Sequence, residues 1–176
     1  YKKLIQMNRK KKILLCCEAS YLNTGYATYG REVMKRLYQT GKYDLAEFAS
    51  YGESTDPRAG EMPWKFYPNS PQKDNKKEIN EYNSKGTNQF GEWKFEQILL
   101  DFQPDIVFDI RDFWMIDYQE RSPFRKYFHW VIMPTVDAEP QNEQWLSTYA
   151  NADGVFNYSE WGKDVLEQEG RGKINC

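Results

Sequence analysis

The sequence has too few cysteines and too little continuous apolar sequence for a disulfide-stapled or membrane-spanning protein. Its 176 residues include three cysteines, an odd number without CxxC or Cys/His spacing, which argues against a disulfide framework and a redox or metal motif. The longest purely apolar run, ILLCC at residues 13–17, is far below the roughly 20 residues that a membrane span requires. No apolar segment of a secretory signal follows the basic N-terminus. We therefore expect a cytoplasmic protein.

The sequence also lacks an excess of charge of either sign, and it has a single histidine. The net charge is -2, so nothing attracts the whole chain to nucleic acid or to an anionic membrane. The only basic run, RKKK at residues 9–12, precedes an apolar segment and is interpreted as the solvated entry of a strand. His129 lies within an aromatic segment, where we expect it to be packed, so a catalytic triad is unsupported. No ligand cluster suggests a metal site.

Short apolar segments with the character of buried strands recur along the chain. They are predicted at residues 11–17, 43–50, 105–110, 127–133 and 154–158, with a weaker one in the aromatic island at 64–67. Residues 51–88 are otherwise rich in Pro, Gly, Asn and Lys and are predicted to form a loop-rich insertion. The chain is expected to be a single domain over residues 1–176.

Helical patterns alternate with these strands. One helix is expected to end at Gly41, one to carry Phe95, Ile98, Leu99 and Phe102 before Pro104, and a short helix or turn to cover 113–118. Asn142 and Ser159 are predicted to cap two more, the second with Trp161, Val165 and Leu166 facing inward and ending at Gly170. The alternation predicts an α/β fold: a Rossmann-like, doubly wound, mainly parallel sheet with helices on both faces.

A parallel sheet of this kind binds its ligands beyond the carboxyl ends of its strands. The loops at 18–30, 110–117 and 134–141 should therefore line one crevice. The first contains NTGYATYG at 23–30, whose glycines do not have the spacing of the GxGxxG dinucleotide motif, which argues against NAD. Gly25 at a helix start would leave free N–H groups for a diphosphate or a sugar hydroxyl. Alternatively, Gly25 only makes the turn, and Gly30 lets the helix approach the sheet.

Acidic residues follow the two central strands. Asp109 and Asp112 end and follow one strand, and Asp137 and Glu139 follow another, so up to four carboxylates could accept hydrogen bonds from hydroxyls or act as a base. Asp109 is better explained as a strand-end or capping residue.

Aromatic side chains make up 16% of the chain, and their flat faces suit sugar rings. The core explains those at expected helix or strand positions, namely Trp93, Phe95, Phe156 and Trp161. Three aromatics in predicted loops keep a ligand interpretation, namely Tyr26, Trp64 and Trp114.

Three segments in this order resemble a known family. They are NTGYATYGREVMKRL, QFGEWKFEQILLDFQPDIVFDIRDFWM and MPTVDAEPQNEQWLSTYANADGVFNYSEWGKDVL, and together they resemble the N-terminal domain of retaining GT-B glycosyltransferases over about residues 11–170. The resemblance implies half of a hexosyltransferase, with a UDP- or GDP-sugar donor held mainly by a C-terminal domain that this chain lacks. The terminal GKINC resembles the start of the last strand before the linker to that domain. The chain alone is expected to be inactive.

The resemblance also implies roles for individual residues. The glycine loop, with Asn23, Thr24, Gly25 and Tyr26, would lie near the donor diphosphate, and the acceptor would contact Asp112, Trp114 and Glu139. Many members carry a histidine after the strand that corresponds to 127–133, whereas this chain has Thr135-Val136-Asp137, similar to a subgroup with PVDG there. Asp137 is therefore the candidate for the reacting hydroxyl, and the alternative is that it only stabilises its loop.

Two other function classes remain open. One is a non-enzymatic α/β module that binds a sugar or nucleotide or regulates a partner. The other is a flavodoxin-like or receiver-like signalling domain, for which only Glu18 and Asp109 offer acidic residues at suitable places.

Overall fold

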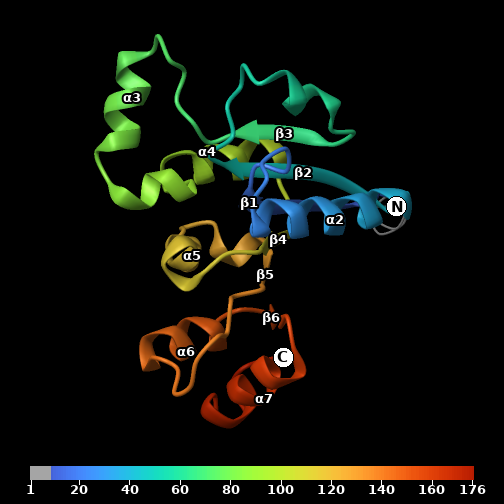
Figure 1. The fold of residues 1–176 in the computed structure, drawn as a ribbon, viewed down its shortest axis with the longest axis vertical. Coiled ribbons are helices and arrows are strands. Elements are labelled where there is room, and N and C mark those ends of the chain that lie inside the picture. Colours follow the sequence, from blue (N-terminus) through green and yellow to red (C-terminus); the bar gives the residue numbers. More distant parts are fainter. Residues whose placement is uncertain (1–8) are drawn as a thin grey trace, which may run out of the picture.

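The computed structural model describes residues 9–176 and contains one parallel sheet of six strands. Their order is β3-β2-β1-β4-β5-β6, and every neighbouring pair runs in the same direction. The strands are β1 (Lys11–Glu18), β2 (Tyr43–Ser50), β3 (Lys65–Pro68), β4 (Ile106–Asp109), β5 (His129–Ile132) and β6 (Gly154–Val155). Figure 1 shows them following one another from β3 at the top to β6 near the bottom. The predicted Rossmann-like α/β fold is confirmed.

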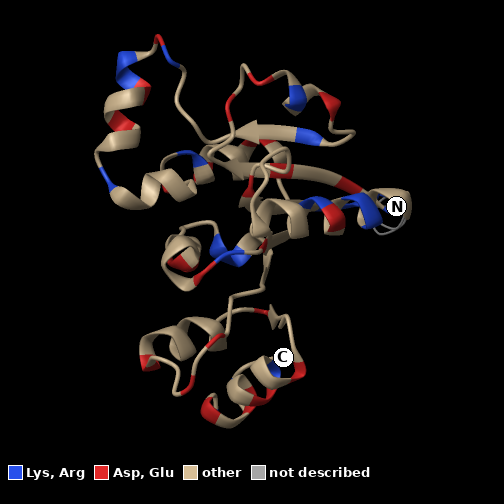
Figure 2. Cartoon of the chain, in the orientation of Figure 1, with Lys and Arg blue, Asp and Glu red and all other residues tan. Residues whose placement is uncertain are grey.

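Helices connect the strands. They are α2 (Gly25–Gln39), α3 (Lys76–Asn83), α4 (Glu92–Phe102), α5 (Phe113–Glu120), α6 (Glu143–Ala150) and α7 (Glu160–Glu169), with shorter 3-10 turns η1 (Pro57–Glu61), η2 (Gly86–Phe90) and η3 (Arg125–Tyr127). Within residues 9–176, none of these helices combines the length and the apolar character that crossing a bilayer would require. Basic and acidic residues are mixed on α2 and α3, whereas α7 carries mainly acidic ones (Figure 2).

Both faces of the sheet are apolar, because successive side chains of a strand point to opposite faces. Leu14 and Cys16 of β1 belong to one buried cluster, which α4, α5 and α6 cover. Leu15 and Cys17 belong to a second cluster, which contains Met34 of α2. The two adjacent cysteines therefore lie on opposite faces, as predicted, and burial raises the pKa of both thiols. They are inert core residues.

Glycines and a cap fix the placement of α2. Thr24 precedes the helix, and its hydroxyl accepts a hydrogen bond from the N–H of Ala27. A Cβ at Gly30 would lie 2.9 Å from Cys17 Sγ, so this glycine lets the helix approach β1 closely, as expected. Gly41 follows the helix with a φ of +64°, which confirms its predicted place beyond the C-terminus.

Three strands are shorter than predicted, and of these β4 lacks one residue at each end. β5 begins at His129 because the residues before it form η3, and β6 ends at Val155 because the chain turns toward the capping residue of α7. Phe156 still donates its N–H to the carbonyl of Ile132. The carbonyl of Asn175 accepts from the N–H of Val155 at 2.8 Å, so the C-terminal segment lies beside β6. Ser159 and Asn142 cap α7 and α6 as predicted.

Residues 51–88 contain more structure than their composition indicates. The aromatic island does form β3, the edge strand, and α3 is a helix that the sequence did not predict. Figure 1 shows α3 standing away from the sheet. Buried Asn69 anchors the segment, because its side-chain amide donates to the carbonyls of Asn88 and Gln89 at 2.9 and 2.7 Å.

A buried ion pair lies at the carboxyl end of β4. Asp109 and Arg111 are both fully buried, and the guanidinium Nε donates to Asp109 Oδ1 at 2.9 Å. Arg111 also donates to Ser50 Oγ at 2.8 Å, and Gln119 of α5 donates to Asp109 Oδ2 at 2.7 Å. Burial acts to lower the pKa of Arg111, but the charge of Asp109, its hydrogen bonds and the nearby Tyr118 and Cys16 together raise it above its ordinary value. The network joins the ends of β2 and β4 to α5.

Replacing Arg111 with Met is expected to destabilise the fold by about 3–5 kcal/mol, because it leaves the Asp109 carboxylate buried without its partner. Urea unfolding gives the free energy. The double variant Asp109→Leu/Arg111→Met should lose much less than the sum of the two single losses. Additive losses would contradict a coupled pair.

Candidate crevice at the carboxyl edge of the sheet

The loops that follow β1 and β5 meet beyond the carboxyl ends of the strands. The hydroxyl of Tyr26, in the first turn of α2, lies 2.8 Å from Thr135 Oγ1, in the loop after β5. A pocket of about 410 Å³ opens beside this hydrogen bond. It is lined by Glu18, Thr24, Gly25, Tyr26, Tyr29, Thr135 and Tyr158. Residues 109 positions apart in sequence thus form one site.

The glycine loop forms one wall of this pocket. Gly25 has an ordinary backbone conformation, and a Cβ added there would meet no atom within 4 Å. Neither the turn nor the packing therefore requires glycine, and Gly25 is exposed beside the pocket. The Thr24 hydroxyl donates to the carboxylate of Glu18, which fixes the loop against the end of β1.

Asp112 brings the loop after β4, the second of the three predicted loops, to the same place. Burial raises the pKa of the Tyr26 phenol, and the neighbouring Asp112 carboxylate raises it further. Tyr149 of α6 is buried, and this burial is the main reason why the pKa of its phenol is raised. The charges of Asp112, Tyr26 and Asp137 raise that pKa further. Asp112 precedes α5, but its side chain makes no capping hydrogen bond. The Asp112 carboxylate therefore does not cap the N-terminus of α5.

The other residues predicted for the site are exposed around the pocket or in the same loops. Asn23 is exposed beside Thr24, and Asp137 and Glu139 are exposed in the loop that follows Thr135. Trp114 of α5 is 51% exposed. Its ring lies 6.3 Å from that of half-buried Trp145, which stacks on Phe113. Trp114, Trp145 and Phe113 therefore form an aromatic cluster close to Asp112, and Trp114 is its exposed member.

Asp109 does not reach the crevice, because the buried pair with Arg111 holds its carboxylate. The structure therefore agrees with the interpretation of Asp109 as a strand-end residue and not with a role in binding. Within the described part of the chain, no group of three or more His, Cys, Asp or Glu side chains could hold a metal ion.

Several predictions for aromatic residues and for the histidine were wrong. Trp64 is not available to a ligand: it is buried, and its Nε1 donates to Glu47 Oε2 at 2.8 Å. Trp161 and Phe156 were expected in the core but are 45% and 58% exposed, since Gly162, Val165 and Leu166 supply the buried side of α7. His129 was expected to be packed, yet it is exposed where β5 begins, at the edge opposite the crevice.

Four pocket residues were not predicted as site residues, namely Glu18, Tyr29, Thr135 and Tyr158. The rule that predicted the other site residues would also have found Glu18 and Thr135, because each lies at or just beyond the carboxyl end of a strand. Tyr29 and Tyr158 pack edge to face with ring centres 5.0 Å apart. Nothing in the local sequence indicates that contact, because it joins the first turns of α2 to the segment before α7.

Comparison with solved structures identifies the fold. A UDP-GlcNAc 2-epimerase from Methanocaldococcus jannaschii matches 94% of this chain with a TM-score of 0.55 and 14% identity, and the match covers 44% of that protein. A sucrose-phosphate synthase from Thermosynechococcus elongatus matches 91% of this chain with a TM-score of 0.57 and 15% identity, over 45% of its length. The chain thus spans less than half of each neighbour. No protein-family model and no curated protein sequence matches it.

Tyr26→Phe is expected to destabilise the protein by about 0.5–1.5 kcal/mol, because it removes the hydrogen bond to Thr135 and keeps the ring. Amide exchange at Thr135 and Val136 should accelerate. Tyr29→Phe is the matched control, since within residues 9–176 the Tyr29 hydroxyl has no hydrogen-bond partner. Equal effects of the two variants would show that the contact does not join the loops.

Proposed function

We propose that this chain is the acceptor-side half of a glycosyltransferase of GT-B architecture, which moves a sugar from a UDP- or GDP-sugar to an acceptor hydroxyl. The other wall of the crevice, with most of the donor contacts, comes from a second Rossmann-like domain. The observation that carries the proposal is the convergence of three loops at one edge of a parallel sheet, where Tyr26 bonds to Thr135 and lies beside Asp112.

The extent of the structural match supports a missing wall. The chain covers about 44% of each neighbour while nearly all of it is matched, as expected for one of two similar-sized domains. The pocket beside Tyr26 is open to solvent, and two of its lining residues, Tyr29 and Tyr158, are exposed. Sites for small molecules usually bury most of the ligand and often lie between domains. A second domain would supply that enclosure.

The names of the neighbours support a nucleotide-linked sugar as the donor. One is an epimerase of UDP-GlcNAc, and the other makes sucrose-phosphate. In this chain the open backbone at Gly25 and the start of α2 suit a diphosphate, because unpaired N–H groups and the positive end of the helix favour an anion. Asn23 and Thr24 flank this position.

The acceptor would lie between the second and third loops. Trp114 offers an apolar face to a sugar ring, and Asp112 and Glu139 offer carboxylate oxygens to its hydroxyls. Asp137 is the candidate that orients or deprotonates the reacting hydroxyl. The Asp137 side chain is exposed, so it could contact a ligand directly. Its loop is held in place by the hydrogen bond between Thr135 and Tyr26.

The proposal requires a second Rossmann-like domain, encoded beyond residue 176 or on a separate chain. The 176-residue chain alone should transfer no sugar from a panel of UDP- and GDP-sugars, and activity should appear when the second domain is joined to it. Transfer by the chain alone would disprove the need for a partner. A parent gene without such a domain, and no separate chain that restores transfer, would favour a binding module instead.

In the two-domain protein, Asp137→Ala is expected to lower kcat on the order of 100-fold or more. Its unfolding free energy should stay within about 0.5 kcal/mol of the parent, because the side chain is exposed. Asp164→Ala, which removes an exposed carboxylate from α7, is the control and should leave kcat unchanged. Unchanged turnover in Asp137→Ala would leave this residue with a role in its loop only.

A further inference from the structure

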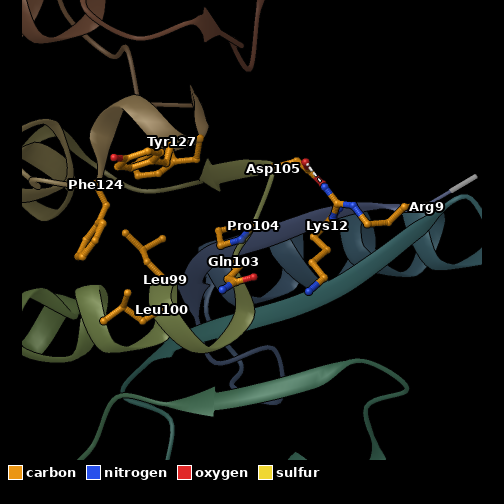
Figure 3. A pocket seen from close by; sticks show the side chains of 10 residues that line it. Arg9, Lys12, Leu99, Leu100, Gln103, Pro104, Asp105, Phe124 and Tyr127 are labelled. Carbon is orange, nitrogen blue, oxygen red and sulfur yellow. Dashed lines mark hydrogen bonds and ion pairs between the residues drawn. The ribbon is translucent and has the colours of Figure 1, made fainter. Parts of the chain in front are cut away.

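A groove of about 670 Å³ lies at the amino edge of the sheet, away from the crevice (Figure 3). It is formed where β1 begins, where α4 turns into β4, and where η3 precedes β5. Its lining residues are Arg9, Lys12, Leu99, Leu100, Gln103, Pro104, Asp105, Phe124, Tyr127 and Phe128. The volume is in the range of sites for small molecules. Neither the sequence motifs nor the proposed sugar transfer uses this groove.

One side of the groove is apolar and unusually open to water. Leu100 is 59% exposed and Tyr127 is 69% exposed, while Leu99 and Phe128 beneath them belong to the buried part of the wall. Figure 3 shows Leu99, Leu100, Phe124 and Tyr127 together on one side. A ligand that covered these side chains would remove apolar surface from water, which is favourable.

The opposite side carries the ammonium of Lys12, whose charge interacts with the Asp101 carboxylate although Asp101 forms its ion pair with Lys65. Lys12 Nζ donates to the carbonyl of Phe102 at 3.0 Å and lies 5.3 Å from the centre of that ring. No carboxylate of the described residues forms an ion pair with it. The nearby Asp105 is already engaged, since it accepts from the backbone N–H of Lys12 and from the guanidinium of Arg9 at 2.8 and 2.7 Å.

The arrangement therefore has an apolar wall at one end and a half-buried cation at the other. Arg9 keeps N–H groups beyond the one bound to Asp105, and its side chain lies on the same side as Lys12 in Figure 3. Charge-assisted hydrogen bonds from both groups would suit a carboxylate or phosphate. Such a head, with an alkyl tail along Leu100 and Tyr127, complements both ends.

We propose that this groove binds a single-chain anionic amphiphile, an alkyl chain with a carboxylate or phosphate head at Lys12 and Arg9. Because the groove and the crevice open at opposite edges of the sheet, this ligand is distinct from the sugar donor and acceptor. The site stands whether or not the chain takes part in sugar transfer.

The experiment titrates the 176-residue chain with hexanoate, octanoate, decanoate and decyl phosphate below their micelle concentrations. Binding is followed by calorimetry and by NMR shifts at Leu100 and Tyr127. Each added methylene should strengthen binding by about fourfold, the ratio expected for a buried CH₂. Decanol, which keeps the tail and lacks the charge, should bind about tenfold or more weakly than decanoate.

Two substitutions test the two ends. Lys12→Gln should lower the affinity for decanoate about tenfold or more, while the amide can still donate to the Phe102 carbonyl. Leu100→Asn should reduce the dependence of the affinity on the length of the alkyl chain. Lys11→Gln is the matched control, because it removes the same charge one residue earlier, from a side chain that does not line the groove. It should change affinity little.

Several results would overturn the proposal. They are equal binding of decanol and decanoate, equal losses in Lys11→Gln and Lys12→Gln, or saturation only above the micelle concentration. Attachment to anionic lipid vesicles without binding of the monomeric amphiphiles would also overturn it, since that would indicate general surface attraction rather than a site.

Discussion

All six strands of the sheet run in the same direction, so the turns that leave their carboxyl ends emerge at a single edge. This constraint brings residues 23–26, 112–114 and 135–139 to one side of the molecule although they are far apart in sequence. The contact of Tyr26 with Thr135 then fixes two of these loops to each other. The same constraint places the amino ends of the strands at the other edge, where the groove beside Lys12 opens. The crevice and the groove therefore lie at opposite edges of one sheet and share no lining residues.

The two kinds of carboxylate at the crevice edge differ because of burial. Asp109 is fully buried, and its two carboxylate oxygens accept hydrogen bonds from Arg111 and Gln119. It therefore links the end of β4 to α5 and has no contact with solvent. Asp137 lies only a strand away and is exposed. The buried Asp109 holds the ends of the strands below the loops, whereas the exposed Asp137 remains open to solvent.

Much of the fold follows from local sequence, since the apolar runs, the caps at Thr24, Asn142 and Ser159 and the glycine after α2 act within a few residues. The parallel direction of the strands and the meeting of three loops were also predicted, because strand–helix alternation leaves few alternatives, whereas the order of the strands was not. What could not be predicted depends on tertiary contacts. Trp64 is buried because Glu47, on a neighbouring strand, accepts its N–H, and Trp161 is exposed because the opposite side of α7 faces the core. The groove at the amino edge joins side chains about 90 residues apart.

The central claim is that the carboxyl-edge loops contact a nucleotide-linked sugar. Its most direct test is an amide NMR titration of the 176-residue chain with UDP-N-acetylglucosamine and GDP-mannose. For at least one of these ligands, the shift changes are expected to gather at residues 23–26, with smaller changes at 112–114 and 135–139. Changes that gather at the amino edge or on α3 would contradict the claim, and so would the absence of changes with either ligand both in the chain alone and after a second domain is joined to it.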